Sequence, residues 1–283
     1  MRDSPSTRKG PFPDYENPPV VETILGVQLE PLTGWRNAHL GAFWKTFNTD
    51  EWPNIFDAPL LHPQFERFAE STRWAKIGAQ FMVTQDPSAR LQIKNKDGDR
   101  MIQVQNSRLH FNWLGQAGSQ YPRYESIRDG FVWVLQRFIE FVVRETAGDF
   151  RPNQWEVTYL NHIPKGTVWN TPNEWGFFLP LGSVPTIEQV VQGESFAGGW
   201  NFIIPEQRGR LHVQWQHGRK SEPKEQEVIV LTFTARGPVA GNENPERAIV
   251  DGLDLGRETI ARSFMAFMSK AANEYWGLKH ASD

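Results

Sequence analysis

The sequence predicts an α+β protein made of two similar halves, each an antiparallel sheet with a long helix packed on one face. Two observations lead to this fold class. Apolar and polar residues alternate in residues 90–113, with turn residues between the runs, and a similar alternation recurs in 202–234. Each of these stretches is followed by a long helical stripe of apolar residues. Identity between the halves is low, so their duplication is a hypothesis that an unrelated strand order would contradict.

Three parts follow along the chain. Residues 1–16 are charged and proline-rich and are predicted to form a disordered leader. Residues 17–164 form the N-terminal half and residues 165–283 the C-terminal half, with one continuous domain as the alternative. At 283 residues the chain is long enough for either arrangement.

Local patterns predict the first elements. Residues 20–30 alternate as a strand, with Leu25, Val27 and Leu29 on one face. Residues 39–47 have apolar side chains at helical spacing. Residues 48–65 contain Pro53, Pro59 and Pro63 and are predicted to be an irregular loop.

Residues 90–113 have the clearest pattern. Three alternating runs are separated by the Asp97–Gly98 turn and by a second turn at Asn106. The pattern predicts an antiparallel meander with one apolar and one polar face.

A long helix is predicted over residues 124–147 from one continuous apolar stripe, with Gly148 as its C-cap. Strands are predicted at 155–159, 202–204, 211–216 and 227–234, and a short helix at 186–192. Asp254 is predicted to cap a final helix that ends at Gly277.

Composition removes several classes of function. The formal charge is −3, which gives no global basic field for nucleic acid. The chain has no cysteine, so disulfides, thiolate metal sites and cysteine nucleophiles are excluded. No apolar stretch is long enough to span a membrane and no signal core is seen, so we predict a cytoplasmic protein without a membrane partner.

Motifs for chemistry are missing. We find no phosphate-binding loop, no nucleophile elbow and no metal-binding histidine pattern, and we predict no catalytic residue, no metal and no cofactor. Glu22 is the one carboxylate singled out for acid–base work. The favoured interpretation of Glu22 is structural, as a carboxylate paired with an arginine or with backbone amides.

The polar face of the predicted sheet is the candidate for partner binding. Its amides offer donors and acceptors without strong charge, which suits recognition of another molecule. An ordinary solvated sheet face is the alternative. Tryptophans in loops could anchor an interface or plug the ends of the sheet, and both interpretations stay open. The candidate partner-binding residues are Gln92, Lys94, Gln103, Gln105, Arg108, His110, Asn112, His212, Gln214, Gln216, Trp169 and Trp175, and Trp52 and Trp200 are further loop tryptophans.

One stretch carries a family resemblance. The string Asn17-Pro18-Pro19-Val20-Val21-Glu22 resembles the opening signature, Asn-Pro-Pro-(Ile/Val)-x-Glu, of a sporadically distributed family of uncharacterised bacterial proteins. Residues 157–161 are similar to that family's Tyr-x-Asn strand, and Phe264 with residues 275–277 is similar to its Phe…Trp-Gly ending. The family's histidine near the start of the last helix is replaced here, by Gly256, Arg257 or Glu258, which argues against a shared catalytic histidine. The resemblance implies a bacterial α+β protein, and its patchy distribution is typical of defence-associated gene cassettes.

The sequence therefore predicts a non-enzymatic, protein-binding regulatory protein, in concrete form an accessory protein of an antiviral cassette such as a CRISPR-associated one. Charge reversal at Gln103 and Gln105 is expected to abolish partner binding without loss of thermal stability. One alternative is a weak nucleic-acid binder that uses Lys94, Arg100 and Arg108. The other alternative is a hydrolase with an unrecognised carboxylate site.

Overall fold

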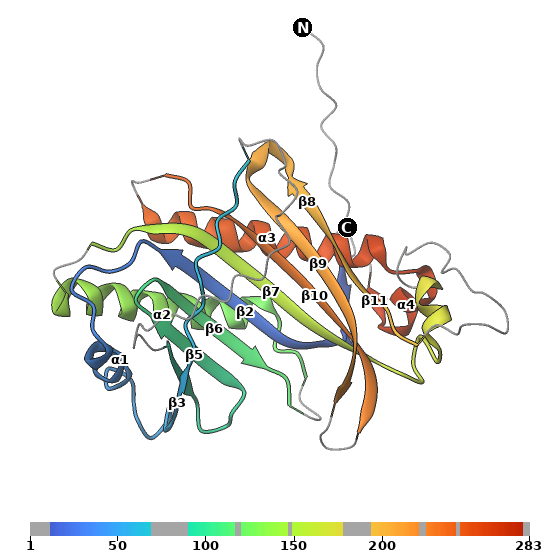
Figure 1. Ribbon diagram of the computed structural model, residues 1–283, viewed down its shortest axis with the longest axis horizontal. Helices are drawn as coiled ribbons and strands as arrows, with labels where there is room; N and C mark the ends of the chain where they lie inside the picture. The colour runs from blue at the N-terminus through green and yellow to red at the C-terminus, as the bar shows by residue number, and fades with distance from the viewer. Residues whose placement is uncertain are drawn as a thin grey trace, which may run out of the picture.

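A large antiparallel sheet organises the protein. The computed structural model describes residues 12–68, 90–116, 120–146, 149–177, 194–220, 225–241 and 244–279. Within these residues, nine strands form a sheet in the order β3-β4-β5-β6-β2-β7-β10-β9-β8 (Figure 1). The predicted mixed α+β class is confirmed, with the strands joined into a single large sheet and the long helices packed against it.

The elements follow in two runs along the chain. The first run contains β2 (Val20–Leu29), α1 (Asn37–Trp44), β3 (Asn54–Ala58), β4 (Arg90–Lys94), β5 (Arg100–Gln105), β6 (Arg108–Leu114) and α2 (Tyr124–Glu145). The second run contains β7 (Pro152–Pro164), η1 (Pro172–Phe177), β8 (Ala197–Ile204), η2 (Pro205–Gln207), β9 (Gly209–Lys220), β10 (Gln226–Pro238), α3 (Pro245–Phe267) and α4 (Lys270–Tyr275).

The strand order is the same in the two runs. β2 pairs with β6, the last strand of the meander β4-β5-β6, and β7 pairs with β10, the last strand of the meander β8-β9-β10. The orders are therefore β2-β6-β5-β4 and β7-β10-β9-β8. β2 and β7 pair antiparallel and join the two sets of strands at the centre of the sheet.

The long helices cover one face of the sheet. α2 packs on β6 and β2, and α3 packs on β7 and β10. Figure 1 shows both helices behind the strands. The apolar stripe predicted for α2 is confirmed, since all its members are buried: Ile127, Phe131, Leu135, Phe138 and Val142. Because residues alternate along each strand, the other face of the sheet receives the polar side chains.

Three local predictions were wrong: the loop at 48–65, the cap at Asp254, and the single final helix to Gly277, which is instead α3 ending at Phe267 followed by the separate helix α4. β3 lies within the predicted loop 48–65; its side chains are exposed or half-buried, so this edge strand has no burial pattern to show. α3 begins at Pro245, which fits the first helical turn, and Asn244 caps it by accepting from the backbone N–H of Arg247. Asp254 instead lies inside α3 and accepts a hydrogen bond from Tyr124 at 2.8 Å.

The predicted leader extends too far. Asp14 and Tyr15 form β1, which pairs with β11 (Leu278–Lys279), and Tyr15 is buried. Gly148 and the predicted helix at 186–192 lie outside the described residues. Among the helices that the structure describes, none is long and apolar enough to cross a membrane.

Candidate functional site: the polar face of the sheet

The side chains predicted for the polar face do share one face, opposite α2 and α3. Their strand neighbours of the other parity, such as Ile102, Phe111 and Val213, belong to the core. This follows from alternation together with the observed registers of β4, β5, β6 and β9. The residues are Gln92 and Lys94 on β4, Gln103 and Gln105 on β5, Arg108, His110 and Asn112 on β6, and His212, Gln214 and Gln216 on β9.

Their exposure differs sharply between strands. The residues on β5 and β6 are buried, from 0% exposed for Asn112 to 6% for Gln103 and Arg108. Gln214 and Gln216 are exposed, while Gln92, Lys94 and His212 are half-buried. Gln103 donates to Asn112 at 2.9 Å. The expectation that charge reversal at Gln103 and Gln105 spares stability is therefore wrong, because it would place unpaired charges in a buried network.

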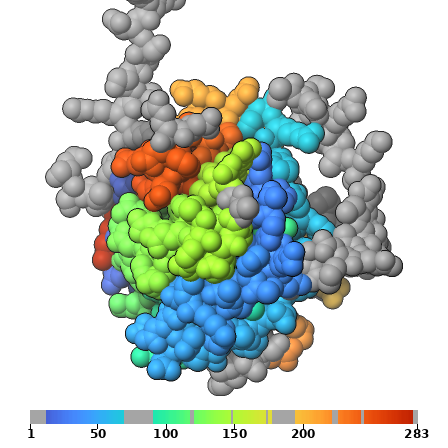
Figure 2. Space-filling view, turned by 90° about the vertical axis from the view of Figure 1, so that its left-hand side faces the viewer, coloured from blue at the N-terminus to red at the C-terminus, as the bar shows by residue number. Residues whose placement is uncertain are grey.

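An extended segment of the same chain crosses this face. We call residues 59–68 the strap; it follows β3 and crosses the sheet in front of the strands in Figure 1, on the side away from the helices. Figure 2, seen from the side, shows α3 at the upper left and the cyan strap region at the upper right, with the central strands between them. The strap has no strand pairing of its own and is held by side chains of the sheet.

The side-chain amide of Gln105 makes two hydrogen bonds to the backbone of one strap residue, as a neighbouring β-strand would. Its side-chain carbonyl accepts from the backbone N–H of Leu61 at 3.0 Å, and its amide nitrogen donates to the backbone carbonyl of Leu61 at 2.9 Å. A primary amide offers one donor face and one acceptor face, so it can satisfy both polar groups of one residue. Arg108 adds a bond to the backbone carbonyl of His62 at 3.3 Å.

Two further glutamines continue this pattern along the strap. The side chain of Gln154 on β7 accepts from the backbone N–H of Glu66 at 3.0 Å and donates to the carbonyl of Gln64 at 2.5 Å. Gln28 on β2 accepts from the backbone N–H of Gln64 at 3.0 Å. Three glutamines on three strands therefore recognise the backbone of one extended segment, independently of its side chains.

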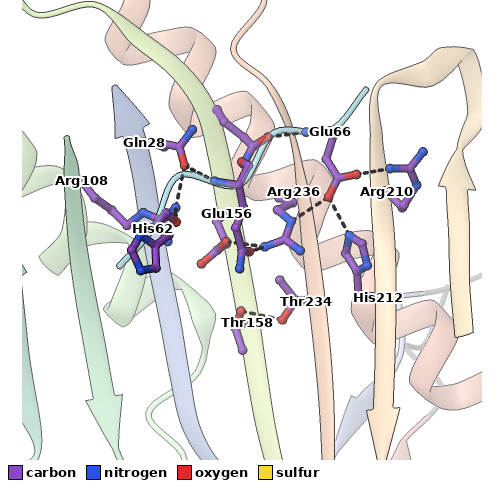
Figure 3. A network of polar contacts seen from close by, with 12 residues as sticks. Gln28, His62, Glu66, Arg108, Glu156, Thr158, Arg210, His212, Thr234 and Arg236 are labelled. Carbon is purple, nitrogen blue, oxygen red and sulfur yellow. Dashed lines mark hydrogen bonds and ion pairs between the residues drawn. The ribbon is translucent and has the colours of Figure 1, made fainter. Parts of the chain in front are cut away.

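The strap places one carboxylate among three basic side chains. Glu66 accepts from Nε of Arg236 at 2.7 Å and from Nη1 of Arg210, and Nε2 of His212 lies 2.6 Å from its Oε1 (Figure 3). Nδ1 of His212 lies 2.6 Å from Oδ1 of Asn201 on β8, which fixes the ring. We call these three basic side chains, Arg210, His212 and Arg236, the carboxylate cluster because together they bind the carboxylate of Glu66.

Glu66 is almost fully enclosed there, with a side chain 4% exposed. Burial alone would raise the pKa of Glu66, but hydrogen bonds from His212 and Arg236, and their charges, lower it to about 2. The carboxylate cluster therefore strongly favours the ionised form of the Glu66 side chain.

The network continues beneath the strap. Arg236 also lies 3.2 Å from Glu156 on β7, and Glu156 lies 3.7 Å from Nε2 of His110 on β6 (Figure 3 shows the first of these pairs). β2 runs between β6 and β7, and its Gly26 leaves the room that the imidazole fills. A Cβ at Gly26 would lie 2.3 Å from Cδ2 of His110, so only glycine fits at this crossing.

The pH dependence of stability should follow from this network. Burial, the largest cause, lowers the pKa of His110 from 6.5 to about 4, so the unfolded chain takes up a proton first. We expect the free energy of unfolding to fall as the pH is lowered from about 6.5 to about 4. Glu66 should add a second loss as the pH falls from about 4.5 toward 2. Urea unfolding measured across this pH range checks both windows.

Two histidine variants test the assignment of the stability loss between about pH 6.5 and 4 to His110. His110→Gln should reduce the loss of stability between pH 6.5 and 4, and the remaining loss includes that from His162, whose pKa is also lowered by burial. His62→Gln, at an exposed residue that contributes only its backbone carbonyl to Arg108, should leave the profile unchanged. Equal profiles for wild type and His110→Gln would contradict the assignment.

The candidate loop tryptophans are core residues. Trp169 and Trp175 are 0% exposed, and their rings pack edge to face, 5.6 Å apart, with His217 against both. Trp169 donates to the carbonyl of Ile163 at 2.9 Å, near the end of β7. Of the two open interpretations, packing at the end of the sheet fits these contacts. Trp52 is also buried. Trp200 is not in a loop: it lies on β8 and is half-buried, with its ring against that of Trp215.

Glu22 lies on the polar face near the start of β2. Its Oε1 accepts from Asn112 at 2.6 Å, and burial, the largest cause, raises the pKa of Glu22. The bond to a buried amide agrees with a structural carboxylate, although its partner is not the arginine or backbone amide predicted. Among the described residues, no group of three or more His, Asp or Glu side chains could hold a metal ion.

Sequence reasoning missed four residues of the site. Gln28 lies on the predicted strand 20–30, whose alternation assigns it to the polar face. Gln154 and Arg236 lie just outside the predicted strands 155–159 and 227–234, in stretches where the alternation of the strand continues. Glu66 lies in a segment without periodicity and carried no signal. Comparison with known proteins gives no match to this chain, neither a family model nor a curated protein nor a solved structure at a significant level.

Proposed function

We propose that this is a non-enzymatic binding protein whose polar sheet face receives an extended acidic segment of another protein. The observation that supports this is the way the strap is held, by glutamine amides on its backbone and by basic side chains around Glu66. In this proposal the strap occupies the face in the free protein, and a partner segment takes its place.

The glutamines and the carboxylate cluster would recognise different parts of the partner segment. Gln28, Gln105 and Gln154 bind backbone groups, which gives affinity for any extended segment. The carboxylate cluster binds one acidic side chain and gives specificity, because hydrogen bonds between charged groups are stronger than neutral ones.

The strap has the properties of a replaceable occupant. Most of its side chains are exposed, with Phe65 at 55%, so its attachment rests on polar contacts more than on buried apolar area. Segments of that kind open locally at a lower free energy than the core does. The sheet beneath is held by its own strand pairs and helices.

A peptide binding experiment tests the proposal. The double variant Gln64→Ala/Glu66→Ala removes both strap side chains that accept from Arg236, so it should free the face. A labelled peptide of the strap sequence, PLLHPQFERF, should then bind in trans. The same peptide with glutamine in place of its glutamate should bind about tenfold or more weakly, since a hydrogen bond to a charged group contributes about 1.5–3 kcal/mol. Fluorescence anisotropy measures both.

The wild-type protein is the matched control. Its own strap should compete, so the strap peptide should bind it at least about tenfold more weakly than it binds the double variant. Circular dichroism confirms that the double variant is folded. Absence of binding to a folded double variant, or equal binding of the two peptides, would overturn the proposal.

Nucleic-acid binding is less well supported by the contacts of the basic residues. Arg108 is buried and bonded to Gln28 at 2.6 Å, and Arg100 pairs with Asp99 at 2.7 Å. These guanidinium groups already have partners inside the protein. The carboxylate hydrolase rests on Glu22 alone. The defence-cassette role and the cytoplasmic location stay predictions.

We also propose that the two runs of elements are duplicated units. The shared strand order supports this, and so does a short sequence match between the helices. Residues 127–131 of α2 read Ile-Arg-Asp-Gly-Phe and residues 249–253 of α3 read Ile-Val-Asp-Gly-Leu. In this proposal the boundary lies between α2 and β7, earlier than residue 164. Superposition of the two units tests it, and helices lying over non-equivalent strands would contradict it.

A further inference from the structure

A pocket lies on the helix side of the sheet, away from the strap. It is formed where the N-terminal end of α2, the middle of α3 and the start of β2 meet β1 and β7. Its walls are mostly apolar, and they carry tyrosine hydroxyls and two arginines. The residues that matter most are Pro19, Tyr121, Tyr159, Arg257, Ile260 and Phe264.

The charges in the pocket do not balance. Arg123 pairs with Asp14 at 2.6 Å, which neutralises both. Arg257 lies over the ring of Phe12 at 3.5 Å and near the ring of Tyr124 at 5.4 Å. In the part of the chain that the structure describes, Arg257 has ring faces as neighbours and no carboxylate or carbonyl as an acceptor. Among the described residues, the half-buried Arg257 guanidinium therefore brings to this mostly apolar cavity a positive charge that has no carboxylate partner.

The tyrosines add hydroxyl groups to the same wall. Tyr121 donates to Tyr159 at 3.0 Å, and burial raises the pKa of both. They therefore stay neutral at physiological pH and bring no negative charge that would oppose an anion. The N-terminal end of α2 faces this region with residues 123 and 124 and adds a partial positive charge.

We propose that this pocket binds a small carboxylic acid, with its carboxylate on Arg257 and its apolar part against Pro19, Ile260 and Phe264. A guanidinium matches a carboxylate with two parallel hydrogen bonds, and stacking on Phe12 holds the guanidinium plane in place. The cavity measures about 80 Å³, so it encloses only a few non-hydrogen atoms of the ligand. This site is independent of the strap and of the carboxylate cluster.

Titration calorimetry with benzoate and its neutral isostere benzamide tests the site. Benzoate should bind in the millimolar range or tighter, and benzamide should bind at least about tenfold more weakly. Arg257→Gln should lower benzoate affinity to that of benzamide. Arg247→Gln, the same substitution on α3 at an exposed residue outside this pocket, should leave benzoate affinity unchanged.

Two results would overturn the proposal. One is equal affinity of wild type for benzoate and benzamide, including no binding of either at millimolar concentration; this comparison does not depend on any variant. The other is a folded Arg257→Gln variant that binds benzoate as wild type does.

Discussion

Replacing Trp155 by alanine is expected to lower the free energy of unfolding by about 3–5 kcal/mol, the range for a large aromatic side chain lost from a core. Trp155 lies on the helix face of β7 and is 2% exposed. A Cβ on Gly252 would lie 2.2 Å from Cδ1 of Trp155, and one on Gly256 would lie 2.8 Å from Cζ3. The backbone of α3 therefore rests directly on the indole, so its removal leaves a cavity that cannot close without moving the helix.

Trp133→Ala is the matched control. Trp133 is 39% exposed on α2, where its ring packs near Trp52 and Arg137. Its loss should cost less than half as much, because water can fill the space that it leaves. Chemical denaturation of both variants measures the difference. Equal losses of unfolding free energy in the two variants would contradict this argument, since they would mean that α3 moves to fill the cavity left by Trp155.

Replacing Arg236 by alanine is expected to cost a similar amount, about 3–5 kcal/mol, for a different reason. Arg236 bridges Glu66 and Glu156, whose side chains are only 4% and 14% exposed. Without the guanidinium, two enclosed carboxylates lose their shared partner. Denaturation of Arg236→Ala at neutral pH gives the loss.

Two further variants separate this effect from a general sensitivity to arginine removal. Arg219 lies on the neighbouring strand β9 and pairs with Glu225, which is exposed just before β10. Arg219→Ala should cost less than about 1 kcal/mol. Glu156→Gln in the Arg236→Ala background should restore part of the lost stability, because Glu156 keeps only His110 beside it, whereas Glu66 keeps Arg210 and His212. Equal costs for both arginines, or no recovery, would contradict the role given to Arg236.

Much of the fold follows from local patterns. Gln103 and Gln105 alternate with Ile102 and Val104, which places the two pairs on opposite faces whatever the strand pairs with. The stripe on α2 is equally local, since helical spacing alone puts Ile127 and Phe138 on one side.

Other parts could not be read locally. β3 was missed because an exposed edge strand has no buried face to produce alternation. The start of α3 was misplaced because Asp254 resembles a cap, while its actual role depends on Tyr124, 130 residues earlier in the chain. Trp169 and Trp175 follow β7 without periodicity, and only the fold encloses them.

The candidate site divides in the same way. Composition and alternation by themselves determined that the chain has an amide-rich polar sheet face and no thiol chemistry. Only the tertiary structure decided that this face is largely buried and that a strap crosses it with Glu66 in the carboxylate cluster. Side-chain direction along a strand is set by neighbouring residues, whereas the ion pair of Glu66 with Arg210 joins residues 144 positions apart, and long-range packing alone brings them together.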